Sequence, residues 1–148
     1  WAVRLPTEFE WEKAARGTDG RFYPYGDTLD KNKSNTEKSG LGHTTPVTQY
    51  PQGASPYGVL DMSGNVWEWC LTDYENPARL AIDENIYSKS IRVSRGGSWH
   101  AAAYVESAAD GSWNYHRPLG RAVFRSKKSP DTRDYFSGFR VVCLPATD

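Results

Sequence analysis

Two carboxylates flank a glycine-containing turn in the stretch YGVLDMSGNVWEWC, residues 57–70. Asp61 and Glu68 lie on either side of Gly64 and Asn65, two residue types that adopt positive φ readily. Ca²⁺ needs several oxygen ligands at about 2.3–2.6 Å, and the carbonyls of a turn can supplement two carboxylates. The stretch therefore predicts a structural calcium site; the alternative is that Asp61 caps the turn and Glu68 pairs with an arginine. The predicted ligands are the side chains of Asp61 and Glu68 and the carbonyls of Met62, Gly64 and Val66.

Patterns for other metals or for a nucleophile are weak. His43, His100 and His116 lie far apart in the sequence, without the close spacing that paired zinc ligands have. Cys70 and Cys143 lie beside apolar residues, which favours buried free thiols over a disulfide. No serine has the surroundings of a nucleophile elbow. We therefore expect neither a transition-metal site nor a serine hydrolase.

The composition is typical of one soluble domain spanning residues 1–148, because 38% hydrophobic residues are enough to form a single core. Lys plus Arg equals Asp plus Glu, at 18 each, so no net field attracts nucleic acid or an anionic membrane. No apolar run approaches the roughly 20 residues of a membrane span. We expect no specific nucleic-acid partner and no membrane span, and a location in the bacterial cytoplasm or within a larger protein.

The elements that would position these residues are few and short. Thr7 and Glu10 have the spacing of a capping box, and Gly17 is a residue type that commonly ends a helix. Together they predict a helix over residues 8–16. Strand patterns begin at Val66 and occupy residues 91–94 and 138–144, with a short extended piece at 46–50. Long polar segments separate them, and structureless connections of this length in a compact domain usually carry function.

Six motifs resemble, in order, those of the formylglycine-generating enzyme family, also called the sulfatase-modifying-factor family. They are RLPTEFEWEKAARG, YPYGD, TPV, YGVLDMSGNVWEWC, RVSRGGSW and SGFRVV. The resemblance spans nearly the whole chain and implies an α+β fold of the C-type lectin-like kind. That fold has one or two short helices, a small antiparallel sheet and long irregular loops. It also implies that the chain lacks the N-terminal part of a family domain.

The resemblance implies loss of the family's catalytic metal. Its oxidases hold copper with two cysteine thiolates at the positions of Ala101 and Glu106, and neither of these side chains can replace a thiolate. The related sulfoxide synthases take their iron histidines from a separate N-terminal domain. We expect no copper; the alternative is an oxidoreductase that is degenerate or completed by missing residues.

The same resemblance bears on ions and on the RGGS motif. A family calcium site coincides with the segment from Asp61 to Glu68, and a second family site would use Asn35 and Thr36 with an acidic residue where Ser39 stands. Gly96 and Gly97 are expected to permit a close approach of the backbone. Arg95 is expected to pair with a scaffold carboxylate such as Glu68.

The segment from Trp99 to Ser137 mixes aromatic residues with Gly, Ser, Pro and Asp, a composition typical of recognition surfaces. It resembles the diversified segment in the variable proteins of diversity-generating retroelements. We therefore predict a noncatalytic domain that binds a protein or other macromolecular ligand, with a purely structural accessory domain as another hypothesis. The predicted contacts are His100, Tyr104, Trp113, Tyr115, His116, Arg117, Ser126, Lys127, Asp134, Tyr135 and Phe136. Trp99 is expected in the core.

Overall fold

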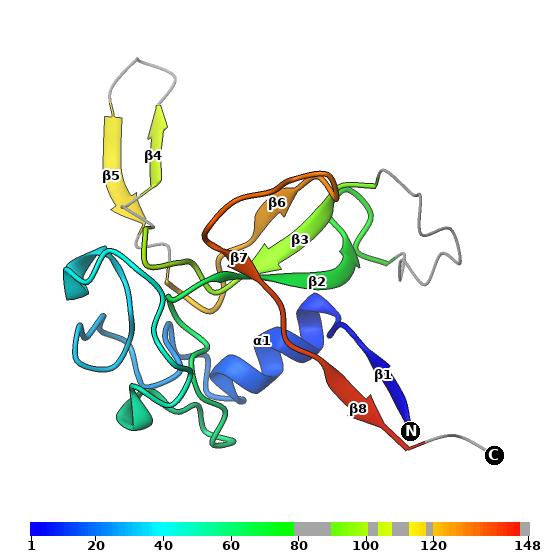
Figure 1. Ribbon diagram of the computed structural model, residues 1–148, viewed down its shortest axis with the longest axis horizontal. Helices are drawn as coiled ribbons and strands as arrows, with labels where there is room; N and C mark the ends of the chain where they lie inside the picture. Colours follow the sequence, from blue (N-terminus) through cyan, green and yellow to red (C-terminus); the bar gives the residue numbers. More distant parts are fainter. Residues whose placement is uncertain (79–89, 101–103, 108–112, 118–119, 146–148) are drawn as a thin grey trace.

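The computed structural model describes residues 1–78, 90–100, 104–107, 113–117 and 120–145 (Figure 1). Within these residues the fold combines one α-helix, two short 3₁₀ turns and short strands, which confirms the predicted α+β class. The helix is α1 (Glu8–Arg16). The strands are β1 (Ala2–Arg4), β2 (Trp67–Asp73), β3 (Arg92–Arg95), β4 (Tyr104–Ser107), β5 (Trp113–Arg117), β6 (Ser126–Lys128), β7 (Ser137–Gly138) and β8 (Val142–Leu144).

Helix α1 has the boundaries and the caps that its sequence predicts. The Thr7 hydroxyl accepts a hydrogen bond from the Glu10 amide at 3.1 Å, and the Glu10 carboxylate accepts one from the Thr7 amide at 2.8 Å. At the other end Gly17 has φ 66°, and its amide donates to the Lys13 carbonyl. Local side-chain chemistry therefore fixes both ends of the helix.

The central sheet has the strand order β6-β3-β2-β7. The pairs β2–β3 and β3–β6 are antiparallel, as expected for this fold. Strand β7 instead runs parallel to β2, with Trp67 opposite Ser137. The chain reaches this far edge after β6, and a strand of two residues carries no pattern from which its direction could be read.

Two further strand pairs lie apart from the central sheet (Figure 1). Strands β1 and β8 form an antiparallel pair, which we call the β1–β8 ribbon. The predicted strand over residues 138–144 is thus divided between β7 and β8. Strands β4 and β5 form a second antiparallel pair. The predicted extended piece at residues 46–50 has no strand pairing and leads into a 3₁₀ turn.

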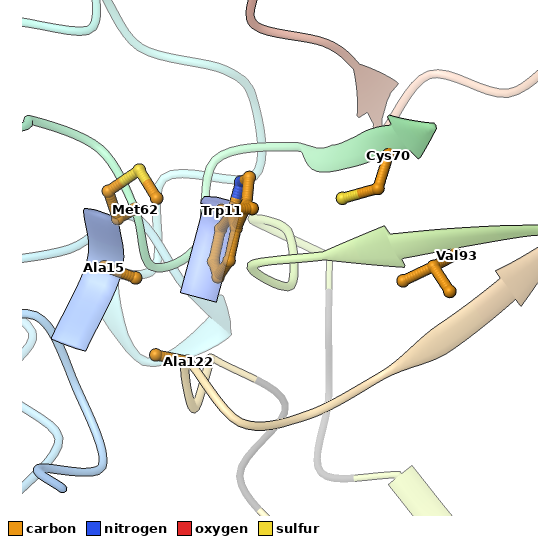
Figure 2. Close-up of a cluster of buried hydrophobic side chains, with 6 residues drawn as sticks. All are labelled: Trp11, Ala15, Met62, Cys70, Val93 and Ala122. Atoms are coloured by element: carbon orange, nitrogen blue, oxygen red, sulfur yellow. The ribbon is translucent and has the colours of Figure 1, made fainter. Parts of the chain in front are cut away.

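The hydrophobic core lies between α1 and strands β2 and β3 (Figure 2). The Trp11 ring occupies its centre, and Gly96 makes room for that ring. Gly96 has φ 95°, and a Cβ added there would lie 3.2 Å from Cζ2 of Trp11. Close approach at this glycine, predicted from the RGGS motif, is therefore confirmed. The buried core side chains are Trp11, Ala15, Met62, Cys70, Val93 and Ala122.

Both cysteines are free, as predicted, but only Cys70 is buried; Cys143 is exposed on β8. Trp99 is half-buried, so its predicted place in the core is only partly realised. Burial raises the pKa of the Cys70 thiol to about 12. Cys143 is therefore the more reactive of the two thiols at neutral pH.

Arg95 pairs with scaffold carboxylates, as predicted, but Glu68, the carboxylate named as an example, is not one of them. The Arg95 guanidinium, 1% exposed, contacts Glu12 at 2.5 Å and Glu8 at 3.5 Å. Both glutamates belong to α1, which covers this face of the sheet. Glu68 pairs with Arg140 instead, at 2.5 Å. The buried charges therefore connect the helix, the sheet and the C-terminal segment.

Candidate functional site

The structure describes the side chains of six of the predicted ligand contacts. They are His100, Ser126, Lys127, Asp134, Tyr135 and Phe136. The other five, Tyr104, Trp113, Tyr115, His116 and Arg117, have described backbones in β4 and β5, and their side chains lie outside the described residues. Ala101, one of the two copper positions, also lies outside them, whereas the backbone of Glu106 belongs to β4.

An aromatic cluster forms where the end of the RGGSWH motif meets the loop before β7. The exposed His100 ring stacks on Phe136, with centroids 5.7 Å apart and an interplanar angle of 26°. Trp99 packs against the same imidazole at 5.3 Å. Two segments that are distant in sequence thus present one surface, in the region that the sequence predicts.

Lys128 holds the loop that carries this cluster. Its ammonium donates to the Asp134 carboxylate at 2.6 Å and to the Ser137 hydroxyl, and it lies 5.0 Å from the Phe136 ring centroid. Burial alone would raise the pKa of Asp134, but hydrogen bonds from Lys128 and Ser137 outweigh it and lower that pKa. Asp134, predicted as a ligand contact, is therefore engaged within the protein, where it positions its neighbours.

The backbone of this loop is also fixed. The Phe136 amide donates to Asp134 Oδ1 at 3.1 Å, and the Phe136 carbonyl accepts from the Trp67 amide of β2 at 2.8 Å. Between these anchored residues the side chain of Tyr135 is 90% exposed. An exposed tyrosine on a rigid backbone offers contact area at low entropic cost.

The two remaining contacts lie on β6, the edge strand next to β3. Lys127 is exposed, and its ammonium lies 5.8 Å from the Tyr74 ring centroid. Ser126 is half-buried and lies opposite Ser94 in the sheet. The sequence analysis did not identify Lys128 and Ser137 as residues that support the site. For Lys128 a signal was present, because side chains alternate along a strand and Lys128 therefore faces the opposite side of β6 from Lys127.

The predicted calcium segment forms a tight turn. Asp61 and Asn65 both have positive φ, at 61° and 62°, and the Asn65 amide side chain donates to Asp61 Oδ2 at 2.6 Å. Burial, with a smaller contribution from the charge of Glu68, raises the pKa of the Asp61 carboxyl to about 6, against the hydrogen bond from Asn65 and the charge of Arg140. A half-buried carboxylate that lies near a second one suits a divalent cation.

Glu68 has the arginine partner that the alternative interpretation predicts. Its carboxylate accepts from Arg140 Nε at 2.5 Å and Nη2 at 2.7 Å, and from the Trp11 indole at 2.5 Å. Arg140 therefore already neutralises one of the two acids. The Asp61 side of the turn fits a hard cation better than the Glu68 side does.

The other metal hypotheses gain no support from the described residues. Ser39 donates to Asn35 Oδ1 at 2.9 Å, so the amide oxygen that the second family ion site would use has a protein partner. His43 is exposed, and its Nδ1 atom lies 2.8 Å from the carbonyl oxygen of Leu41. Within the ranges that the structure covers, no three His, Cys, Asp or Glu side chains gather as metal ligands.

A small scaffold of one helix and short strands that holds an exposed aromatic cluster on anchored loops defines a loop-rich α+β domain. The family model of the sulfatase-modifying factor enzyme 1-like domain matches residues 1–144 of the sequence, and the chain belongs to this family. No helix in the described ranges has the length and apolarity needed to cross a bilayer.

Similar proteins include both catalytic and noncatalytic members. The chain is 36% identical, over 93% of its length, to the inactive C-alpha-formylglycine-generating enzyme 2 of Bos taurus, of which it covers 42%. It is 34% identical to the hercynine oxygenase of Mycolicibacterium thermoresistibile, over 84% of this chain and 31% of that one. The chain thus spans less than half the length of these curated relatives.

Among solved structures, Treponema denticola variable protein 1 matches with a TM-score of 0.68 at 31% identity, over 97% of this chain and 48% of that one. This similarity confirms the predicted resemblance to variable proteins.

Proposed function

We propose that this chain is a noncatalytic ligand-binding domain on a C-type lectin-like scaffold. Its proposed contact surface is centred on His100, Tyr135 and Phe136, and the five contacts that the sequence predicts in β4 and β5 are proposed as further members. The observation that carries the proposal is Tyr135, which is 90% exposed between anchored neighbours. Such preorganisation lowers the entropic cost of binding a protein or another macromolecule.

The sequence supports a role without redox chemistry. Alanine and glutamate stand at the two positions, 101 and 106, where the family's oxidases have copper thiolates. One relative is named as an inactive formylglycine-generating enzyme and another as a variable protein. Their names favour binding over catalysis for this scaffold.

To test binding, peptides that bind the wild-type chain are selected from a random-peptide display library. Peptides that use the proposed surface will bind the Tyr135→Ala and His100→Ala variants at least about tenfold more weakly, since a buried aromatic contact contributes about 2 kcal/mol or more. Tyr57→Ala is the matched control, because Tyr57 is 55% exposed and belongs to a different loop. Equal losses in all three variants would refute the proposed surface.

The catalytic alternative has a direct test, since a hercynine oxygenase is among the relatives. Cu(I) and Fe(II) are titrated separately into the chain, and oxygen consumption is followed with a thiol substrate. We expect no turnover with either metal. Stoichiometric binding of either metal together with turnover would overturn the noncatalytic assignment.

We also propose that Ca²⁺ binds at the turn, through the Asp61 carboxylate and the carbonyls of Met62, Gly64 and Val66. Glu68 would then share its carboxylate between the ion and Arg140. The half-buried Asp61 carboxylate beside Glu68 supports this proposal. Isothermal titration with CaCl₂ tests it: the wild-type chain takes up one ion and Asp61→Asn takes up none. Equal affinity in both chains would show that the ion binds elsewhere.

A further inference from the structure

The loop between β6 and β7 carries an arginine that forms no ion pair with any carboxylate of the described residues. Arg133 is exposed, and its Nη1 donates to the carbonyls of Pro130 and Thr132, each at 3.0 Å. Within the described ranges, neither its Nε nor its Nη2 donates a hydrogen bond. Figure 1 shows this loop joining two strands of the central sheet, away from the two chain ends. The guanidinium therefore has one free edge, formed by Nε and Nη2.

Other arginines of this chain hold carboxylates with the same edge. Arg140 donates from Nε and Nη2 to Glu68, at 2.5 and 2.7 Å. Arg125 donates from the same two atoms to Glu8, at 2.6 and 2.9 Å. This side-on geometry matches the two oxygens of a carboxylate and forms a strong bidentate pair. The free edge of Arg133 therefore fits a carboxylate that comes from outside the chain.

The backbone of the loop holds the Arg133 guanidinium in place. The Thr132 amide donates to the Ser129 carbonyl at 2.9 Å, which closes a turn. The two carbonyls that accept from Nη1 belong to this same turn. Because the side chain is already ordered, binding through its other edge costs less conformational entropy than binding through a free arginine does.

The acids of this loop leave that edge open. Asp134 pairs with Lys128 at 2.6 Å, so these two charges cancel within the chain. Asp131 is exposed, and no ion pair joins it to Arg133 or to another described residue. A single arginine fork suits one carboxylate, whereas phosphate groups on peptides are recognised by clusters of arginines. The anion that fits best is therefore a carboxylate.

The neighbouring tyrosine indicates what accompanies the carboxylate. Asp134 turns inward to Lys128, and the residues on either side of it, Arg133 and Tyr135, are both exposed, the latter by 90%. A phenol ring next to a guanidinium offers an apolar contact beside a charged one. A peptide segment supplies both complements, because it can present an acidic side chain next to an apolar one.

We propose that Arg133 and Tyr135 bind an acidic peptide segment. The Nε–Nη2 edge of Arg133 receives the side-chain carboxylate of an aspartate or glutamate, and Tyr135 packs against the residue beside it. This inference rests on the proposed ligand-binding function, and it names the chemical class of the partner.

A random-peptide display library tests the inference. Each peptide is joined to its carrier through the C-terminus, so that only side chains supply carboxylates. Peptides selected on the wild-type chain are expected to be enriched in Asp or Glu at one position relative to the unselected library. Peptides selected on the Arg133→Gln variant are expected to lack this enrichment.

The affinity of one selected peptide, synthesised with an amidated C-terminus, is then measured by isothermal titration. Arg133→Gln in the chain, or replacement of the acidic residue of the peptide by its amide, should each weaken binding at least about tenfold, because a bidentate charged pair is lost. Both changes together should weaken binding little more than either alone, since they remove the same pair. Arg133→Lys should restore only part of the affinity, because lysine keeps the charge without the fork.

Lys38→Gln is the matched control. It removes the same charge from an exposed side chain in the 3₁₀ turn Glu37–Ser39 and should leave the affinity unchanged. An equal loss in Lys38→Gln and Arg133→Gln would show general charge attraction and overturn the carboxylate site. The change in the peptide tests the pair without altering the chain, so the result does not depend on the folding of a variant.

Two further outcomes separate this inference from the proposed function. Selected peptides without acidic enrichment, or additive losses from the two changes, overturn the carboxylate site. If those peptides still lose affinity for Tyr135→Ala, the proposed ligand-binding surface stands. A library that yields no binder, or peptides that bind Tyr135→Ala as tightly as the wild type, overturns both proposals.

Discussion

Replacing Asp61 by asparagine should stabilise the protein in the absence of calcium. The pKa of this carboxyl rises from 3.8 to about 6 in the folded protein, chiefly because of burial. At about 1.36 kcal/mol per pKa unit the ionised form costs ~3 kcal/mol, and the partial exposure of the side chain reduces this to ~2 kcal/mol. Asparagine has no charge to bury and can still accept the hydrogen bond that Asn65 donates to Asp61 Oδ2.

The gain should depend on pH in a defined direction. The folded chain holds the Asp61 proton more tightly than the unfolded chain does, so protonated Asp61 carries no penalty below about pH 4. The penalty grows as the pH rises between 3.8 and about 6 and is complete at pH 7. The variant should therefore exceed the wild type by about 2 kcal/mol at pH 7 and by less than about 1 kcal/mol at pH 4.

Urea unfolding at both pH values, with EDTA present, measures this difference. Asp131→Asn is the control, because Asp131 is exposed and its replacement should change the unfolding free energy little. Adding CaCl₂ should stabilise the wild type and leave Asp61→Asn unchanged, since only a chain that binds the ion gains from it. A variant that is less stable than the wild type at pH 7, or equally stabilised at both pH values, would refute the burial argument.

Three further substitutions test local features by urea unfolding. Thr7→Ala removes the helix cap and should cost about 1 kcal/mol, whereas an unchanged midpoint would contradict the capping role. Glu8→Gln should cost about 3 kcal/mol because Glu8 is 2% exposed and accepts from Arg125 at 2.6 Å; a loss below about 1 kcal/mol would argue against this buried pair. Gly96→Ala should cost about 2 kcal/mol because φ is 95° and Trp11 lies against the site; Gly40→Ala, with open space around it, should cost less.

Local signals in the sequence were sufficient to predict the helix and the positions of most of the predicted strands. The capping box of Thr7 and Glu10 and the stop at Gly17 act through bonds between near neighbours, so their effect does not depend on the rest of the fold. The strand patterns that begin at Val66 and at Ile91 were also predicted, and they correspond to β2 and β3. The parallel β7 was not, because its two residues gain their direction only from pairing with Trp67 and Glu68.

The sequence indicated which aromatic side chain is exposed, but not which side chains are held by contacts within the protein. Tyr135 was expected to be exposed, and it is. Asp134 was taken as a contact, yet Lys128 holds it inside the loop. Whether Asp134 or Tyr135 faces solvent depends on which segments of the chain meet in the fold, and the amino-acid composition of the segment does not contain that information.

The sequence by itself determined the family, the helix, the turn around Asp61 and the absence of thiols at positions 101 and 106. These depend on residue identities and short-range geometry. The tertiary structure alone decided which acids Arg95 and Arg140 pair with and which way β7 runs. Charges and apolar groups find their partners across the whole chain, so their energies depend on distances that only the folded state sets.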